Sequence, residues 1–249
     1  MIAGRPAMGK SLVAGQTARH IATRECAHVL FASLEMSEAE LAQRHLVAET
    51  GIDPERLHLG QIKTHDWPAI LKAGADSEHV PLHILDDGSL TVSTLRARAR
   101  QVAVRSGQLG LIVVDYLQLM RNEPPSRSRV EDVSTFSRGL KQLARELNVP
   151  VIAVSQLNRG VEQRPDKRPI LADLRDSGQV EADADAVLML YRDDYYDEDS
   201  ERPGEMDIIV RKNRQGRLGH VKTRIDSRLR YLQIKRNAPF STPAPSNTV

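Results

Sequence analysis

The chain opens on a short apolar segment and then reads Gly4-Arg5-Pro6-Ala7-Met8-Gly9-Lys10-Ser11. This stretch fits the pattern G-x-x-x-x-G-K-[ST], whose glycines let backbone N–H groups curl around phosphates at the start of a helix. In such a loop Lys10 reaches the β- and γ-phosphates, and the hydroxyl of Ser11 binds Mg²⁺. A plain glycine turn before a helix is the alternative, but it gives no reason for Lys and Ser to follow directly. The stretch therefore predicts a nucleotide-binding α/β domain.

Composition agrees with one sizeable domain. The chain has 249 residues and a net charge of +2, and a domain of this length can bury a large core. Cys26 is the single cysteine, so no intrachain disulfide can form and a reducing cytoplasm is the expected compartment. The sequence has no run of about 18 apolar residues, so it predicts no membrane-spanning helix. With one Trp, five Tyr and three Phe, a nucleic acid would be held mainly through its phosphates rather than by base stacking.

Short apolar runs alternate with amphipathic stretches along the first three quarters of the chain. Ser37 to Glu40 form a capping box that predicts a helix to about Thr50, and further helices are expected from Thr91 to about Ser106 and from Val130 to Leu147. This alternation predicts a mainly parallel sheet covered on both faces, with ligands at the carboxyl ends of its strands. The expected buried strands are Val29–Ala32, Leu82–Leu85, Leu111–Val114, Val151–Val154 and Ala186–Leu190.

The pattern changes after Tyr191. Asp193 to Glu201 carry six acids and no base, whereas Arg211 to Ile225 carry six bases and no acid. Antiparallel hairpins at the sheet edge fit this later part best. The domain is expected to span residues 1–236, followed by a disordered tail from Asn237 to Val249 that is rich in Pro, Ser, Thr and Asn. The expected edge strands are Met206–Val210, Gly219–Ile225 and Leu229–Ile234, with turns at Gln215-Gly216 and Asp226-Ser227.

Three polar side chains follow predicted strands at the edge where the phosphate loop should lie. Asp115 ends an apolar strand, as does the carboxylate of the Mg²⁺ shell in nucleoside triphosphatases, although it could merely cap the next segment. Glu35 could orient and deprotonate the attacking water, or it could be a solvated loop acid. Gln156 could sense the γ-phosphate, or it could serve as a loop hydrogen bonder.

Taken together, six ordered segments resemble the C-terminal, RecA-like motor domain of DnaB-type replicative DNA helicases. The resemblance implies a P-loop ATPase that uses ATP and Mg²⁺, a homo-hexameric ring with ATP sites between subunits, and 5′-3′ movement along threaded single-stranded DNA. It also implies a primase and a helicase loader as partners in DNA replication. The segments are Gly4 to Ser11, Ser33-Leu34-Glu35-Met36, Asp115-Tyr116-Leu117-Gln118-Leu119-Met120, Ser155-Gln156-Leu157-Asn158-Arg159, Asp173-Leu174-Arg175-Asp176-Ser177-Gly178 and Lys212-Asn213-Arg214.

The resemblance also assigns roles by position. It makes Glu35 the catalytic glutamate, Asp115 a residue of the metal shell and Gln156 the γ-phosphate sensor, in agreement with the reasoning from the residues themselves. Lys212 and Arg214 match two basic fingers that reach into the neighbouring subunit's ATP. From spacing alone, these two residues would instead suggest a solvated basic strand edge.

A central DNA-binding loop of the family matches Arg175, Asp176 and Gly178, where an arginine and backbone amides grip phosphates. The family usually has Glu where this chain has Asp176, so the side chain there is one methylene shorter and its contact need not carry over. Without the resemblance, the segment from Leu157 to Asp176 would suggest plain polar surface.

One departure concerns the start of the chain, where only Met1-Ile2-Ala3 precede the phosphate loop. The family has a full strand there, preceded by a linker helix and a helical N-terminal domain. We therefore expect a truncated motor with an incomplete central strand, low stability and weak ring assembly. Two alternatives stay open: another RecA-like ATPase, of recombinase or clock type, and an inactive interaction module.

Overall fold

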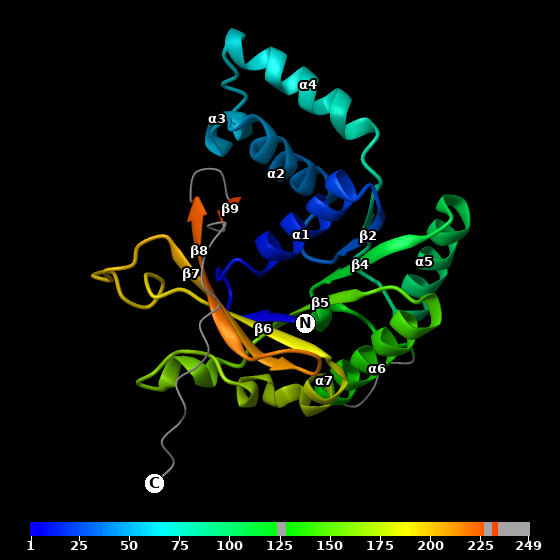
Figure 1. The fold of residues 1–249 in the computed structure, drawn as a ribbon, viewed down its shortest axis with the longest axis vertical. Coiled ribbons are helices and arrows are strands. Elements are labelled where there is room, and N and C mark those ends of the chain that lie inside the picture. The colour runs from blue at the N-terminus through cyan, green and yellow to red at the C-terminus, as the bar shows by residue number, and fades with distance from the viewer. Residues whose placement is uncertain (124–127, 227–230, 234–249) are drawn as a thin grey trace.

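A computed structural model of the chain describes residues 1–123, 128–226 and 231–233. Within them, one nine-stranded sheet has the order β3-β2-β4-β5-β1-β6-β7-β8-β9 (Figure 1). The first six strands in that order run parallel, and β7, β8 and β9 add antiparallel hairpins at one edge. The strands are β1 Ile2–Gly4, β2 His28–Ser33, β3 Leu82–Asp86, β4 Leu109–Asp115, β5 Val151–Gln156, β6 Ala186–Tyr191, β7 Glu205–Asn213, β8 Gly219–Asp226 and β9 Tyr231–Gln233.

Helices cover both faces of the parallel part, so the predicted α/β class is confirmed. The α-helices are α1 Lys10–Arg24, α2 Glu38–Thr50, α3 Pro54–His58, α4 Trp67–Glu78, α5 Val92–Ser106, α6 Arg129–Leu147 and α7 Gly178–Asp183. Short 3-10 helices are η1 Thr64–Asp66, η2 Leu117–Leu119, η3 Arg159–Gln163 and η4 Leu171–Ser177. In the described residues, no helix is both long enough and apolar enough to span a bilayer.

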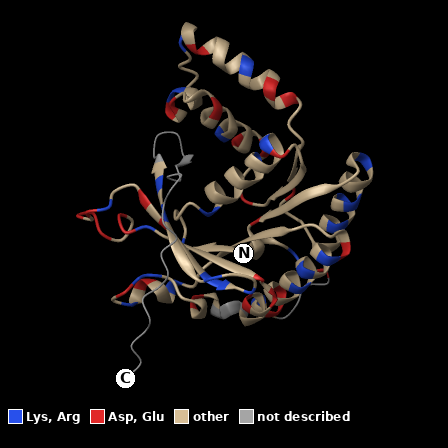
Figure 2. Ribbon diagram, viewed as in Figure 1, with Lys and Arg blue, Asp and Glu red and all other residues tan. Residues whose placement is uncertain are grey.

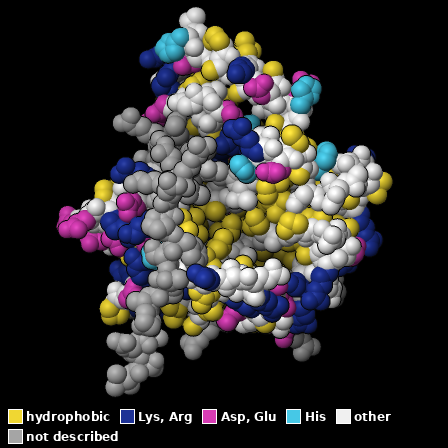
Figure 3. All heavy atoms as spheres, in the orientation of Figure 1, with side chains coloured by type: hydrophobic (Ala, Val, Ile, Leu, Met, Phe, Trp, Pro, Cys, Tyr) yellow, Lys and Arg dark blue, Asp and Glu magenta, His cyan; other side chains and the backbone are white. Residues whose placement is uncertain are grey.

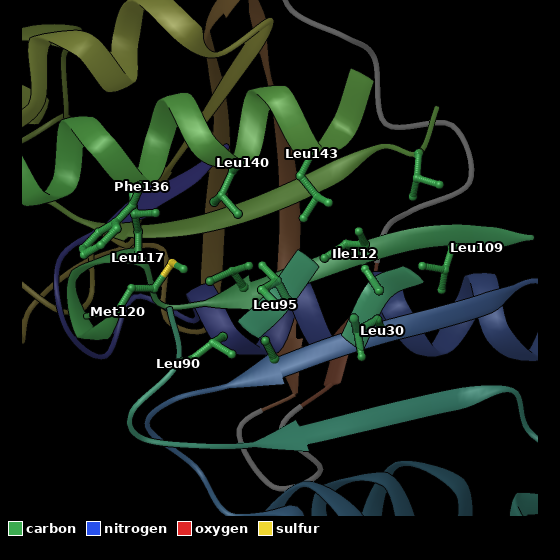
Figure 4. Close-up of a cluster of buried hydrophobic side chains, with 14 of the residues drawn as sticks. Leu30, Leu90, Leu95, Leu109, Ile112, Leu117, Met120, Phe136, Leu140 and Leu143 are labelled. Atoms are coloured by element: carbon green, nitrogen blue, oxygen red, sulfur yellow. The ribbon is translucent and has the colours of Figure 1, made fainter. Parts of the chain in front are cut away.

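Successive side chains of the central strands point to opposite faces of the sheet, and apolar side chains are buried on both faces. On β2, Leu30 packs beneath α5 and α6 whereas Phe31 packs on the side of α1. On β4, Ile112 and Val113 divide in the same way. Figure 4 shows the first of these clusters, with Leu140 and other side chains of α6 pointing down onto the sheet. Because both faces are buried, these strands carry continuous apolar runs rather than alternating ones.

Predicted strands and helices outside the C-terminal edge are found within a few residues of their expected bounds. The capping box is present, since Ser37 accepts from the Glu40 N–H and Glu40 accepts from the Ser37 N–H. The segment from Leu157 to Asp176, for which plain polar surface was the alternative to a DNA-binding loop, contains the short helices η3 and η4. Of the expected last strand, Leu229–Ile234, only residues 231–233 are described, as β9; residues 227–230 and the expected tail, 237–249, lie outside the described residues.

Helices α2, α3 and α4 form an arm at the top of Figure 1. The sequence predicts only α2 of these three helices. Pro54 and Pro68 stand at the first turns of α3 and α4, where proline is tolerated, so residues that usually break helices here begin them. Trp67 and Leu71 of α4 are exposed, and apolar side chains are visible on the arm in Figure 3.

Ion pairs with arginines stabilise the connection from β6 to β7, where Asp194 of the acidic run pairs with Arg192 at 3.0 Å. Nearby on β7, Asp207 is 1% exposed and accepts hydrogen bonds from Arg168 at 2.9 Å and from Arg202 at 2.6 and 3.1 Å. Burial alone would raise the pKa of Asp207, but the hydrogen bonds from the two arginines outweigh it and lower the pKa. Figure 2 shows acidic residues gathered on this β6–β7 connection and basic residues along α5.

Replacing Asp207 with Ala should therefore lower the free energy of unfolding by about 3 kcal/mol, because two guanidinium groups lose their buried partner. The folded-state pKa is lowered, so this stabilisation is fully present above the carboxyl's unfolded-state pKa of about 3.9 and is lost as the pH falls through the folded-state value. Urea unfolding at neutral and acid pH measures both effects. As a control, Glu198→Ala at an exposed position should change stability by less than about 0.5 kcal/mol; equal effects of the two changes would contradict the assignment.

Candidate nucleotide-binding site

The phosphate loop connects β1 to α1 in the middle of the sheet. β1 lies between β5 and β6, so the loop emerges at the carboxyl ends of the parallel strands. Gly9 has φ 88° and ψ 22°, a left-handed conformation that side chains with a Cβ rarely adopt, and helix α1 starts at the next residue. Ala7 also has a positive φ of 60°. Successive N–H groups in such a turn, ending at a helix N-terminus, form a ready anion-binding cradle.

Lys10 is the first residue of α1, and its Nζ donates to the carbonyl of Arg5 at 2.9 Å. Burial lowers the pKa of Lys10, and the negative charges of Asp115 and Glu35 oppose that shift. An ammonium group held inside the loop and facing two carboxylates is placed where it can bind the phosphates of a nucleotide.

Asp115 ends β4 and is 3% exposed. Burial raises its pKa, and a hydrogen bond with the Ser11 side chain works in the opposite direction. Its Oδ1 atom is buried and has no hydrogen-bond partner among the described residues. A buried carboxylate oxygen without a donor is costly unless it binds a cation. Ser11 and Asp115 therefore fit Mg²⁺, which is typically held by one or two protein oxygens together with phosphates and water.

Glu35 lies two residues beyond β2 at the same edge of the sheet. The neighbouring Leu34 N–H donates to the Asp115 carbonyl at 2.8 Å, which joins the ends of β2 and β4. The Glu35 side chain is exposed, and its charge acts on Lys10, Asp115 and Tyr116. The structure thus brings Lys10, Asp115 and Glu35 together, as the sequence predicted.

Gln156 is the last residue of β5, and the side chain of Gln118 binds its backbone. The Gln118 side chain donates to the Gln156 carbonyl at 3.1 Å and to Ser155 Oγ at 2.9 Å, and it accepts from the Gln156 N–H at 3.2 Å. Gln118 was not among the predicted site residues. The signal that could have found it is its position just after the strand that carries Asp115.

Arg5 was predicted to line the phosphates together with the rest of the loop. Its guanidinium leaves the loop instead: Nε donates to Glu162 at 2.7 Å, and a terminal nitrogen donates to the Leu157 carbonyl at 2.8 Å. The side chain is nearly buried. Arg5 can therefore contribute its backbone to phosphate binding while its side chain ties the loop to the segment after β5.

Lys212 and Arg214, predicted as fingers, lie at the opposite edge of the sheet from the phosphate loop. Lys212 pairs with Val187 near the start of β6, whereas β1 and β5 deliver the loop and Gln156 at their carboxyl ends. Both side chains bind backbone carbonyls at the end of α7, Lys212 that of Glu181 and Arg214 that of Ala182 at 2.7 Å. Within one chain they do not join the nucleotide site.

The predicted DNA-binding residues fall at the junction of η4 and α7. Gly178 starts α7, is exposed and has open space where a Cβ would be. The side chains of Arg175 and Asp176 lie outside the described part of the structure. Asp173 anchors this junction, since Arg164 donates to both its carboxylate oxygens at 2.7 and 2.9 Å. A cavity of about 400 Å³ lies between the phosphate loop and this segment, and its lining includes Arg129 and Arg159, neither of which is a predicted site residue.

Comparison with known proteins gives consistent results. Residues 1–233 match the family described as "DnaB-like helicase C terminal domain". Over 223 residues the chain is 45% identical to the replicative DNA helicase DnaB of Geobacillus stearothermophilus, covering 89% of this chain and 49% of that protein. It is 44% identical over 222 residues to the replicative DNA helicase DnaC of Bacillus subtilis, with the same coverage. The chain thus spans about half the length of these curated relatives.

Solved structures show the same likeness. One solved ATPase domain superimposes with a TM-score of 0.90 at 36% identity, covering 94% of this chain and 83% of that one. A DnaB-like replicative helicase, studied with its primase interactions, superimposes with a TM-score of 0.89 at 36% identity, covering 93% of this chain and 56% of that one.

Proposed function

Because the chain belongs to the family of DnaB-like helicase C-terminal domains, we propose that it is the ATP-hydrolysing motor of a replicative DNA helicase. The observation that carries this proposal is the grouping of Lys10, Ser11, Asp115 and Glu35 around the phosphate loop at one sheet edge. The relatives' names favour the helicase over a recombinase or a clock-type ATPase. The proposed motor domain is residues 1–236, and the proposed compartment is the cytoplasm.

In the proposed reaction, water attacks the γ-phosphate of ATP and yields ADP and phosphate. The loop N–H groups and Lys10 hold the phosphates, and Ser11 and Asp115 hold Mg²⁺, which when bound neutralises charge on the phosphate oxygens. Glu35 orients the attacking water and takes its proton. The amide of Gln156, fixed from behind by Gln118, senses whether a γ-phosphate is present.

The site is completed by a second subunit in this proposal. Lys212 and Arg214 lie at the far edge of the sheet, so they can serve only a neighbouring chain's nucleotide. A closed ring satisfies this for every subunit, because each contributes its phosphate loop to one interface and its fingers to the other. A hexamer, threaded single-stranded DNA, a primase and a loader are the partners proposed on family grounds.

We expect binding of single-stranded DNA to depend on ATP, to be insensitive to base sequence and to weaken steeply with salt, because phosphate contacts carry it. Arg175→Ala should weaken binding to all sequences alike. It should also reduce the magnitude of the slope of log affinity against log salt by about 1, the value expected for the loss of one phosphate contact. Fluorescence anisotropy with oligonucleotides of several sequences, at several salt concentrations, measures both. A strong preference for one sequence, or affinity that does not respond to salt, would contradict this mode of binding.

A further inference from the structure

Arg5 is an arginine inside the phosphate loop and is only 7% exposed. Burying a guanidinium is costly unless it is paired, and here two directed hydrogen bonds offset that cost. One goes to Glu162 on η3 at 2.7 Å and the other to the carbonyl of Leu157 at 2.8 Å. Leu157 in turn donates its N–H to the Gly4 carbonyl at 3.2 Å. The phosphate loop and the segment after β5 are thus bonded together in both directions.

On the nucleotide side, Arg5 also contacts the lysine that binds phosphate. Its carbonyl accepts from Lys10 Nζ at 2.9 Å. A phosphate that takes over the Lys10 ammonium must compete with this hydrogen bond. A phosphate in the loop can therefore change a contact of the Arg5 backbone.

On the other side, the segment held by Arg5 leads directly to the proposed DNA-binding residues. Asn158, next to Leu157, donates its N–H to the Asp173 carbonyl at 3.0 Å. Asp173 is fixed by Arg164 and opens the family segment that continues to Arg175 and Gly178. Hydrogen bonds thus lead from Lys10 through Arg5 to the Leu157 carbonyl and, across the Leu157–Asn158 peptide unit, from the Asn158 N–H to Asp173 at the base of the DNA-binding segment.

We propose that Arg5, held in place by its ion pair with Glu162, is a positioning residue that couples the occupancy of the phosphate loop, through the Leu157 carbonyl, to the DNA grip of the η4–α7 junction. This rests on the proposed function and adds a route by which ATP changes DNA affinity. Coupling between two ligands is reciprocal, so DNA should strengthen binding of an ATP analogue by the same factor as the analogue strengthens binding of DNA.

The test uses the full chain and changes Glu162, to which we assign no contact with phosphate or DNA. Affinity for an oligothymidine is measured with and without a non-hydrolysable ATP analogue, and affinity for the analogue is measured with and without the oligonucleotide. Glu162→Ala should leave analogue binding without DNA unchanged and reduce the coupling factor at least about fivefold. Glu162→Gln keeps an acceptor for Arg5 Nε and should retain part of the coupling.

The matched control is Glu146→Ala. Glu146 on α6 forms ion pairs with Arg96 and Arg100 on α5, and the substitution removes both pairs. The exposed fractions of the two glutamate side chains are 32% for Glu146 and 36% for Glu162. It should leave the coupling factor unchanged. In a double-mutant cycle, Glu162→Gln should have no further effect once Arg5→Gln is present. If the Arg5 variant does not fold, the two Glu162 variants decide alone.

The outcomes separate this inference from the function beneath it. If the unaltered chain binds no ATP analogue or no DNA, the proposed function fails. If it shows coupled binding and Glu162→Ala keeps the full coupling factor, or Glu146→Ala loses as much, the role of Arg5 is refuted.

Discussion

Exchanging Glu35 for Gln is expected to lower the rate of ATP hydrolysis at least about a hundredfold while ATP still binds, because an amide cannot take the proton of the attacking water. The glutamine keeps the size and the hydrogen-bonding reach of the side chain. Glu35 lies at the exposed mouth of the site, so its replacement should not disturb the fold. Single-turnover hydrolysis and equilibrium binding of a fluorescent ATP analogue measure the two effects separately.

Lys10→Ala is the companion variant and should abolish nucleotide binding itself. Its ammonium lies in the phosphate loop, where the charges of Asp115 and Glu35 act on it. The two variants should thus have different phenotypes, one failing in chemistry and the other in binding. Equal loss of ATP affinity in both would refute the roles given to Lys10 and Glu35.

Mixing Arg214→Ala chains with Lys10→Ala chains is expected to restore ATP hydrolysis that neither variant shows alone. In a mixed ring, some interfaces pair an intact phosphate loop from one chain with an intact finger from the other. The expectation follows from the fold, since Arg214 hydrogen bonds at the end of α7 and lies across the sheet from its own loop. Steady-state ATPase across a series of mixing ratios, with oligomer mass recorded for each, makes the measurement.

The control for this experiment is Arg217→Ala mixed with Lys10→Ala, because Arg217 is an exposed base just beyond β7 that matches no family segment. The ATPase of those mixtures should fall in proportion to the fraction of Lys10→Ala chains, as expected if the Arg217 variant is merely diluted. If mixed oligomers form and the Arg214 mixture remains as inactive as its components, Arg214 does not act between subunits.

Much of the site could be predicted because its residues lie within short, recognisable sequence patterns. A glycine-rich turn followed by Lys10 and Ser11 has one common use, and Asp115 ends an apolar strand whose burial the structure confirms. Since the carboxyl ends of parallel strands share one edge, Glu35 and Gln156 could be brought to the same place without knowing their contacts.

Other parts of the site depend on pairings that no local pattern contains. The partner of Arg5 is Glu162, far along the chain, and nothing near either residue indicates the other. Lys212 and Arg214 look like a solvated strand edge until the register of β6 and β7 shows which end of the sheet they occupy. Helices α3 and α4 of the arm were not predicted, because a proline stands in the first turn of each.

The order of the strands also shapes how the chain can fold. β1 precedes β2, β3 and β4 in the sequence but lies between β5 and β6, where Ile2 sits beside Val154 and Leu188. During synthesis the early strands β2, β3 and β4 can pair while β1 has no neighbour, because its partners leave the ribosome much later. The ends that must meet are far apart in sequence, which slows the search for this pairing. The phosphate loop, attached to β1, is therefore assembled late, after most of the surrounding sheet already exists.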